Sequence, residues 1–582
     1  MRALEATAHI GEEPSRIFPA IIGEIAKQRS EKQALLSKRE TMTFGALAAR
    51  MNSYSRWALA QEIAKGDVVC LLMPNRPEYV AIWLGITQVG GVVALLNTNL
   101  RGSALAHCIQ AAAPRHVIVA AELAKSFAEA APHLATAPRL WLHGDAPLAA
   151  DRIDREAQAF DGAPLNASER RPVTLADRAL LIYTSGTTGL PKAAHVSHHR
   201  IVSWSRWFAG VADIGPNDRM YDCLPLYHSV GGVVAIGAAL VNGGSAVIAE
   251  RFSPRRFWED VVAWGCTLFQ YIGELCRYLV AEPAHRLERA HRLRIACGNG
   301  MRADVWAAFQ KRFAIPRILE FYAATEANFS LTNVEGKVGA IGRVPGFLPS
   351  RNTIALVRFD VESGAPARGA DGLCIRAPRG EAGEAIGRIA AGKDQLSSRF
   401  EGYTNAVDTE KKILRNVFAR GDAWLRSGDL MRVDEKGFYY FVDRIGDTFR
   451  WKGENVSTTE VAAALCACSG VLDAAVYGVA APGAEGRAGM ALIVAGEALD
   501  LSAVAAELRA KLPAYARPLF LRIRPSLDLT STFKHQKQDL VREGFDPARI
   551  ADPLFVFDRT NDAYVRLDRD CFSAIEHGAI RL

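Results

Sequence analysis

The chain has 582 residues, of which 49% are apolar and 23% are charged, a balance that is typical of a globular enzyme and excludes a disordered chain or a disulfide scaffold. Because a single hydrophobic core stops growing at roughly 250–300 residues, we expect more than one domain. Lys and Arg outnumber Asp and Glu by 70 to 63, which gives a net charge of +7. This excess is too diffuse for a nucleic-acid partner and favours anionic ligands or an anionic membrane face.

Targeting and membrane signals are weak. The N-terminus carries acidic residues early and lacks the apolar core of a secretory signal peptide. The ten cysteines are scattered without a Cys-x-x-Cys pair, which indicates reduced thiols and a cytoplasmic location. The best candidate for a membrane span, residues 230–241, has about 12 residues against the ~20 that are needed, so we expect it to be buried core.

The first half of the chain predicts alternating strands and helices. Apolar runs rich in Val and Ile at 67–73, 91–97 and 116–120 indicate buried parallel strands. Between the first two, residues 77–88 begin with a proline and repeat apolar residues at helical spacing, which predicts a crossover helix. This rhythm predicts layered α/β architecture.

Four later strands share a useful feature. Each is followed at once by small or polar residues, and they are expected at 179–183, 245–249, 293–297 and 318–322. Ligands of open α/β sheets collect at the carboxyl ends of the strands. We therefore expect the loops 184–192, 298–300 and 323–326 to converge on one crevice.

A change of composition indicates a second domain. Residues 362–387 are rich in Gly, Ala and Pro, which predicts loops and short hairpins. After a lead-in strand at 437–444, Ser457 and Glu460 form a capping-box pattern that opens a helix. The elements expected next are strands at 471–480, 489–495 and 518–524 and a helix at 501–511. We predict a large domain at 1–443 and a small α+β domain at 444–582.

The loop TSGTTGLPK at 184–192 has the composition of a phosphate cradle, with glycines that expose N–H groups, several hydroxyls and a lysine. It is not a Walker loop, because Leu190 and Pro191 separate Gly189 from Lys192. Taken alone, such a loop is more often an ordinary turn.

Other segments give this loop a context. In chain order they are PLYHSVGG (225–232), EFYAATEAN (320–328), RSGDL (426–430), DRIGDTFRWKGEN (443–455) and STFKHQK (531–537). Together with the loop, they resemble the adenylate-forming superfamily of acyl-CoA synthetases, nonribosomal adenylation domains and luciferases. Four segments are more specific and resemble the fatty acid transport protein and very-long-chain acyl-CoA synthetase family. They are residues 97–108, 333–343, 446–461 and 537–547.

The resemblance implies an α/β fold with a large N-terminal adenylate-forming domain of layered sheets and helices and a small, mobile α+β C-terminal domain. It also implies two half-reactions. A carboxylate attacks the α-phosphate of ATP to give acyl-AMP and pyrophosphate, and the thiol of coenzyme A then displaces AMP. ATP, Mg²⁺ and coenzyme A are the expected small molecules.

The resemblance assigns roles to the residues of this chain that match the motifs of the superfamily. The resemblance assigns catalysis to Lys534, Thr325 and Glu326, with Glu326 also on Mg²⁺, a hard cation that suits a carboxylate and phosphate oxygens. The residues expected to contact ATP or AMP are Thr184, Ser185, Gly186, Thr187, Thr188, Gly189, Lys192, Asn299, Tyr322, Ala324, Asp429 and Arg444. Of these, Tyr322 would stack on adenine, Asn299 would bind its edge, and Asp429 would accept from the ribose hydroxyls.

The remaining assignments concern the acyl chain, coenzyme A and domain movement. His228, Gly298 and Ala323 are expected to contact the acyl group, within a wall formed by 226–240 and 269–278. Lys452, Gly453 and Glu454 are expected to face coenzyme A, with 486–487 close by. The hinge is expected at Gly446 and Asp447, where many relatives carry Asp or Lys in place of Gly446, and Ser531 replaces a common glycine near Lys534.

Three functions stay open from the sequence. The leading one is an ATP-dependent ligase of long- or very-long-chain fatty acids to coenzyme A, acting in the cytoplasm or peripherally on the inner face of a membrane. A second is a ligase for a sterol or bile-type acid. The third is a membrane-associated fatty acid carrier with a vestigial nucleotide site, which is opposed by the joint presence of the phosphate loop, Glu326, Asp429 and Lys534.

Overall fold

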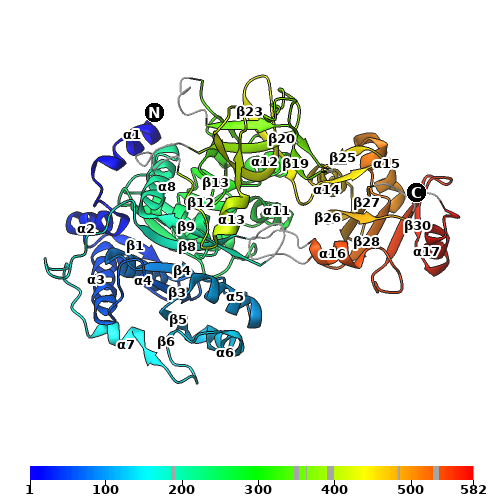
Figure 1. Cartoon of the computed structure of the whole chain (residues 1–582). Coiled ribbons are helices and arrows are strands. Elements are labelled where there is room, and N and C mark those ends of the chain that lie inside the picture. The colour runs from blue at the N-terminus through cyan, green and yellow to red at the C-terminus, as the bar shows by residue number, and fades with distance from the viewer. Residues whose placement is uncertain are drawn as a thin grey trace. The chain divides into compact units, whose positions relative to one another are not determined.

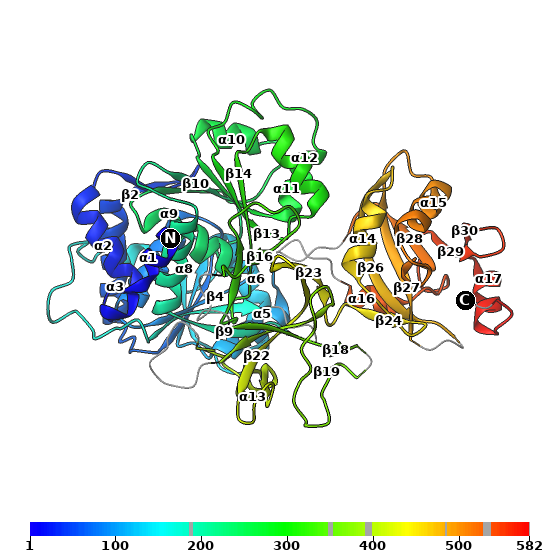
Figure 2. The same ribbon diagram turned by 90° about the horizontal axis from the view of Figure 1, so that it is seen from above.

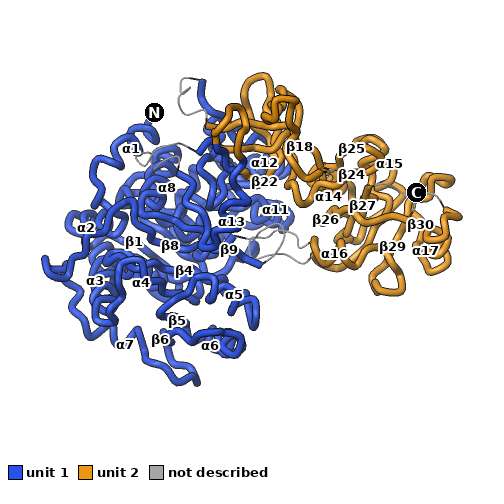
Figure 3. The backbone as a smooth tube through the Cα atoms, viewed as in Figure 1, with its two compact units in different colours: residues 1–351, 388–414, 423–425 blue, residues 352–387, 415–422, 426–582 orange. Residues whose placement is uncertain are grey.

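Two compact units make up the chain (Figure 3): residues 1–351, 388–414 and 423–425 form unit 1, and residues 352–387, 415–422 and 426–582 form unit 2. The computed structural model describes residues 1–184, 190–346, 353–361, 363–389, 399–482, 486–527, 537–580 and 582. Helices and strands alternate along unit 1, and unit 2 ends in a sheet with helices, so the α/β prediction is confirmed (Figure 1). The predicted boundary between a large and a small domain at 443/444 stays a prediction.

A seven-stranded sheet lies in unit 1. Its order is β7-β6-β5-β3-β4-β8-β9, and every neighbouring pair is parallel except β8 and β9. The strands are β3 (Val68–Leu72), β4 (Val92–Leu95), β5 (His116–Ala120), β6 (Arg139–His143), β7 (Asp151–Arg152), β8 (Arg178–Thr184) and β9 (Lys192–Ser197). All residues of β4 and β5 are buried, as their continuous apolar sequence predicted.

The second sheet of unit 1 is mixed. Its order is β16-β15-β14-β13-β12-β10-β11-β1-β2, parallel from β14 to β1 and antiparallel at both ends. The strands are β1 (Gln33–Leu36), β2 (Thr41–Thr43), β10 (Arg219–Asp222), β11 (Ser245–Ile248), β12 (Leu268–Ile272), β13 (Ile295–Asn299), β14 (Arg317–Ala323), β15 (Ser330–Asn333) and β16 (Gly342–Arg343). The predicted strand at 293–297 starts two residues later in the structure, as β13.

Helices cover these sheets. In unit 1 they are α1 (Arg2–Ala8), α2 (Phe18–Arg29), α3 (Phe44–Ala60), α4 (Pro77–Gln88), α5 (Gly102–Ala112), α6 (Ala124–Ala130), α7 (Ile153–Gln158), α8 (His198–Val211), α9 (Ile236–Leu240), α10 (Phe257–Ala263), α11 (Gly273–Ala281), α12 (Ala303–Phe313) and α13 (Ala406–Lys411). Seen from above, α8 and α9 lie on one side of β13 and β14, and α11 and α12 lie on the other (Figure 2). Phe208 of α8 packs on Phe321 of β14 with ring centroids 4.6 Å apart.

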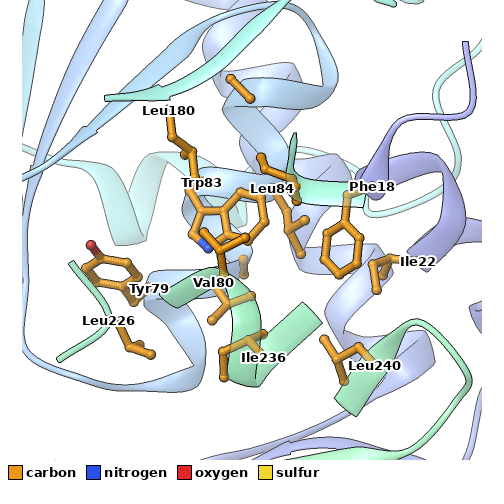
Figure 4. Close-up of a cluster of buried hydrophobic side chains, with 14 of the residues drawn as sticks. Phe18, Ile22, Tyr79, Val80, Trp83, Leu84, Leu180, Leu226, Ile236 and Leu240 are labelled. Carbon is orange, nitrogen blue, oxygen red and sulfur yellow. The ribbon is translucent and has the colours of Figure 1, made fainter. Parts of the chain in front are cut away.

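The main core of unit 1 surrounds α4, which has the predicted bounds and starts at Pro77. Figure 4 shows Trp83 of this helix among Phe18 of α2, Leu180 of β8 and Ile236 of α9. Trp83 stacks on Phe18 with ring centroids 6.0 Å apart, and both side chains are almost fully buried. A helix that is apolar all round is stable only when it is enclosed in this way.

The apolar run 230–241 is buried core, as predicted. It forms a π-helical segment, Ser229–Ala235, that continues into α9, and Val233 to Leu240 are all buried. Among the described residues, no helix combines the length and the hydropathy that a membrane span requires.

Unit 2 contains a five-stranded sheet of order β26-β27-β28-β29-β30 and several smaller strands. The strands are β17 (Ile354–Val357), β18 (Phe359–Asp360), β19 (Ala365–Pro366), β20 (Gly383–Arg388), β21 (Ile413–Arg415), β22 (Ala423–Val433), β23 (Phe438–Arg444), β24 (Phe449–Trp451), β25 (Glu454–Val456), β26 (Val471–Ala480), β27 (Arg487–Ala495), β28 (Phe520–Arg524), β29 (Leu554–Asp558) and β30 (Ala563–Arg566). Of these, β20, β21 and β22 also include residues of unit 1. The helices are α14 (Thr458–Cys466), α15 (Leu501–Lys511), α16 (Gln538–Glu543) and α17 (Arg569–Glu576).

The local signals for unit 2 were accurate. The Ser457 side chain accepts a hydrogen bond from the backbone N–H of Glu460, as a helix N-cap should. The predicted strand at 471–480 and helix at 501–511 match β26 and α15.

Candidate active site

The ends of β13 and β14 form one edge of the site. The two strands are parallel neighbours, so the loops that follow Asn299 and Ala323 leave the sheet side by side. Gly298 lies so close to β12 that an added Cβ would be 2.2 Å from the carbonyl oxygen of Tyr271. Only glycine fits there. Two of the three loops predicted to converge therefore do so.

A buried carboxyl group connects the two strand ends at this edge. Glu320 of β14 accepts hydrogen bonds from the backbone N–H of Met301, at 3.1 Å, and from the hydroxyl of Tyr271, at 2.5 Å. Burial raises the pKa of Glu320 to about 8. Glu320 thereby ties the segment after Asn299 to the strand that leads to Thr325.

Thr325 and Glu326 follow β14 and face other parts of unit 1. The Thr325 hydroxyl lies 3.0 Å from the hydroxyl of Ser229, the first residue of the π-helical segment. One carboxylate oxygen of Glu326, Oε1, accepts a hydrogen bond from the Tyr403 hydroxyl at 2.8 Å and lies 3.5 Å from the Lys412 ammonium. The Glu326 side chain is only 11% exposed, so these contacts fix its direction.

Tyr403 connects Glu326 to the phosphate loop. Its hydroxyl also hydrogen-bonds the side chain of Thr184, the last residue of β8, and burial raises its pKa above the usual range. The Lys192 ammonium lies 5.9 Å from the centre of the Tyr403 ring and pairs with Asp408 at 2.9 Å. Both ends of the phosphate loop therefore lie at Tyr403, next to Glu326.

Six of the predicted site residues lie outside the described residues: Ser185, Gly186, Thr187, Thr188, Gly189 and Lys534. The structure locates the two flanks of the loop, and the roles assigned to these six residues stay predictions.

The residues predicted for adenine lie at the same strand ends. Tyr322 is half-buried and stacks on Phe329 with ring centroids 5.9 Å apart. The side-chain oxygen of Asn299 is buried and has no hydrogen-bond partner among the described residues. An amide acceptor left in this state fits the exocyclic amine of a purine. Ala324 lies in the turn between Ala323 and Thr325.

Asp429 and Arg444 form a pair within unit 2. They face each other across the antiparallel strands β22 and β23, and the Arg444 Nε lies 4.0 Å from a carboxylate oxygen of Asp429. Gly446 and Asp447 lie in the turn after β23, where the Asp447 carboxylate contacts Lys537 at 3.1 Å. Their hinge role stays a prediction.

The residues predicted for coenzyme A form a hairpin turn in unit 2. Lys452 and Gly453 connect β24 to β25, with φ angles of 52° and 84°. Two consecutive left-handed residues make the tight turn of a two-residue hairpin, and glycine is favoured there. Glu454 starts β25, and Trp451 pairs with Gly486, which lies nearby as predicted.

The residues predicted to contact the acyl group make fewer informative contacts than the residues around Glu326. His228 directly precedes the π-helical segment, and its ring lies 4.6 Å from that of Tyr227. Ala323 is exposed at the end of β14. Gly298 and Ala323 thus lie at the same sheet edge as Thr325, and their contact with an acyl chain stays a prediction.

Three residues whose side chains contact those of Glu326 or Lys192 were missed from the sequence: Tyr403, Asp408 and Lys412. They flank or belong to α13, whose only sequence signal is the helix cap at Asn405. A cap predicts where a helix starts and says nothing about what lies opposite it in the fold.

Comparison with known proteins shows the family to which the chain belongs. The family model described as "AMP-binding enzyme" matches residues 23–382, and that of the "AMP-binding enzyme C-terminal domain" matches residues 460–534. The chain belongs to the AMP-binding enzyme family. The resemblance to adenylate-forming enzymes is therefore confirmed.

Relatives of known name cover nearly the whole chain of this AMP-binding enzyme. It is 42% identical over 573 residues to long-chain fatty acid transport protein 1 of Mus musculus, covering 97% of this chain and 88% of that protein. It is 39% identical over 580 residues to long-chain fatty acid transport protein 2 of Rattus norvegicus, covering 98% and 92%.

Solved structures confirm the fold. An anthranilate CoA ligase in complex with anthranoyl-AMP matches with a TM-score of 0.75 at 21% identity, covering 90% of this chain and 96% of that one. ATP-bound MatB from Rhodopseudomonas palustris matches with a TM-score of 0.74 at 24% identity, covering 90% and 98%.

Proposed function

We propose that this AMP-binding enzyme joins a long- or very-long-chain fatty acid to coenzyme A through an acyl-AMP intermediate, consuming ATP and releasing pyrophosphate and AMP. The observation that carries the proposal is the position of Tyr403, which holds the Glu326 carboxylate beside Thr184 and Lys192 at the ends of the phosphate loop. A serine- and threonine-rich loop in that position is suited to a triphosphate.

In the first half-reaction two anions must meet, so positive charge and preorganised donors supply the main catalytic effect. In this proposal Lys192 and the loop residues bind the β- and γ-phosphates, and the Thr325 hydroxyl donates to the α-phosphate. Lys534 contacts the carboxylate and the α-phosphate. The unpartnered oxygen of Asn299 receives the adenine amine, and Asp429 receives the ribose hydroxyls.

The residues present fit a magnesium ion bound with ATP. Mg²⁺ is held in proteins by one or two carboxylates together with phosphate oxygens. The Glu326 carboxylate already faces a cation, the Lys412 ammonium 3.5 Å away, and Tyr403 links it to Thr184, where the phosphate loop begins. When bound, Mg²⁺ would neutralise charge on the triphosphate. The Tyr403 hydroxyl and the Lys412 ammonium keep the Glu326 carboxylate in place for this contact.

In the second half-reaction, the proposal gives Lys452, Gly453 and Glu454 the role of admitting coenzyme A after a rotation about Gly446 and Asp447. The hairpin turn 452–453 is exposed, which a contact with a large cosubstrate requires. The proposal includes a cytoplasmic location with peripheral contact to a membrane, because the acid partitions into lipid and the chain carries a net charge of +7.

The names of the relatives support a long-chain fatty acid over a sterol or bile-type acid. The test uses purified protein with ATP, Mg²⁺ and coenzyme A, and a panel of oleate, lignocerate, cholate and acetate. We expect acid-dependent AMP, pyrophosphate and acyl-CoA with the two fatty acids. Product with cholate alone would move the protein to the bile-type class. Fatty acid binding without pyrophosphate would leave only the carrier function.

A further inference from the structure

Arg200, near the start of α8, carries a buried positive charge that the predicted chemistry did not use. Its side chain is 7% exposed, and Nε lies 3.2 Å from the carboxylate of Glu401, which is 9% exposed. Burial lowers the pKa of Arg200, and the Glu401 charge opposes that effect. Burying two charges costs desolvation free energy, so a buried ion pair is weak evidence for stability. The other contacts of Arg200 indicate a different role.

Those contacts lead directly to the site. Nη1 of Arg200 donates to the backbone carbonyl of Thr325 at 2.5 Å, and Nη2 donates to that of Glu326 at 3.4 Å. Nη2 also donates to the carbonyl of Arg399 at 3.1 Å. A guanidinium has five donors in a fixed plane, so one side chain can hold several carbonyls in one geometry.

Glu401 is itself fixed to the start of α8. Its carboxylate accepts hydrogen bonds from the backbone N–H of Ser197, at 2.8 Å, and from the Ser197 hydroxyl, at 2.6 Å. The same hydroxyl caps α8 by accepting from the N–H of Arg200. The ion pair is thus anchored at both members to one rigid helix end.

Two residues beyond Glu401 comes Tyr403, which donates to the Glu326 carboxylate. The segment 399–403 therefore reaches the turn 325–326 twice, through Arg200 at the backbone and through Tyr403 at the carboxylate. A shift of this segment would move both the carboxylate and the backbone of Glu326.

We propose that the Arg200–Glu401 pair is a positioning device that sets the Thr325–Glu326 turn for acyl-AMP formation. Arg200 is a positioning residue, because its donors are used by protein carbonyls. The proposal rests on the proposed function for the reaction concerned, and on the hydrogen bonds alone for the position of the turn.

Arg200→Lys is the main test, because lysine keeps the charge but has no planar array of donors. Arg294→Lys is the control for the donor geometry, at a side chain that is more exposed, 36% against 7% for Arg200. Arg294 also donates to two backbone carbonyls, of Ala212 and Asp213, and pairs with Asp218 at 2.7 Å, away from the site residues. Glu401→Gln keeps the shape of the carboxylate and removes its charge.

Two readouts are measured on all variants: amide hydrogen exchange of the whole chain, and kcat and KM for ATP in acid-dependent pyrophosphate release. For Arg200→Lys we expect faster exchange confined to 323–328 and 399–403, and a fall in kcat of about ten- to a hundredfold with little change in KM, since small misplacements cost rate. Glu401→Gln should also raise the exchange of these two segments and lower kcat, but by smaller amounts. Arg294→Lys should leave kcat and the exchange of these two segments unchanged.

Exchange at 323–328 that equals that of the unsubstituted protein would overturn the proposal. So would a uniform rise in exchange over unit 1 with equal losses for Arg200→Lys and Arg294→Lys, which would make Arg200 a general stabilising residue. Amide exchange needs no substrate. If the unsubstituted protein releases no pyrophosphate with any acid, the proposed function fails, and exchange still decides whether Arg200 holds the turn.

Discussion

Tyr403→Phe is the most direct test of the site, because it removes a single hydroxyl. That hydroxyl donates to Glu326 at 2.8 Å and hydrogen-bonds Thr184. A hydrogen bond to a charged group contributes about 1.5–3 kcal/mol. Each ~1.4 kcal/mol of transition-state stabilisation corresponds to a tenfold change in rate. The Lys412 ammonium, 3.5 Å from the same oxygen, remains in the variant, so the loss should lie near the lower end.

We therefore expect kcat/KM for ATP to fall about tenfold, with a higher Mg²⁺ concentration needed for half-maximal rate. The assay is fatty-acid-dependent pyrophosphate release over a Mg²⁺ titration, with thermal melting as the check on folding. Tyr440→Phe is the control, because its hydroxyl also donates to a carboxylate, that of Asp434 at 3.0 Å, in unit 2. Unchanged kinetics in Tyr403→Phe, or equal losses in both variants, would show that the Tyr403 hydroxyl does not support the Glu326 carboxylate in catalysis.

Three further predictions concern Lys534, Glu326 and the buried His198. Lys534→Ala should abolish most acyl-AMP formation and leave the attack of coenzyme A on supplied acyl-AMP largely intact; equal losses in both half-reactions would contradict its assigned role. Glu326→Gln should weaken the use of Mg²⁺-ATP, and kinetics that do not change over a Mg²⁺ titration would remove Glu326 from the metal site. Burial lowers the pKa of His198 from 6.5 to about 4, although Asp177 opposes the effect. The unfolded chain then binds more protons between these values, so stability should fall as the pH drops from 6.5 to 4, by up to ~3 kcal/mol. In urea unfolding, His198→Gln should flatten this dependence, and the exposed His133→Gln should not; equal slopes in both would refute it.

Much of the fold could be predicted because its signals are local. The strands β3, β4 and β5 are continuous apolar runs, which a sheet buried on both faces requires. Helix α4 starts at a proline, and α14 starts at a serine cap. Strands without such contrast, including β9 and β10, were missed, because their residues are mixed and their pairing is decided by neighbours elsewhere in the chain.

The site, too, has residues that local sequence signals predicted and residues that they did not. Motif order located Thr325 and Glu326 correctly after the end of β14, because a strand and the loop that follows it are contiguous in sequence. Lys192 was expected at the end of a loop and instead starts β9. No motif identified Arg200 or Tyr403 as part of the site. Neither residue belongs to a recognisable motif. An isolated arginine is most often a surface residue, and an isolated tyrosine is most often part of the surface or the core, so neither indicates a site.

Short-range sequence signals were sufficient to predict the strands and helices with a clear apolar pattern or cap, and the order of the motifs was sufficient to indicate the AMP-binding enzyme family. The pairing of polar groups that are distant in sequence depends on the folded chain. Ser197 and Glu401 are 204 positions apart, Arg200 and Thr325 are 125 apart, and Glu326 and Tyr403 are 77 apart. The partner of a buried polar group is set by the packing of whole elements, because the cost of burial must be offset by whichever group the fold brings within hydrogen-bonding distance.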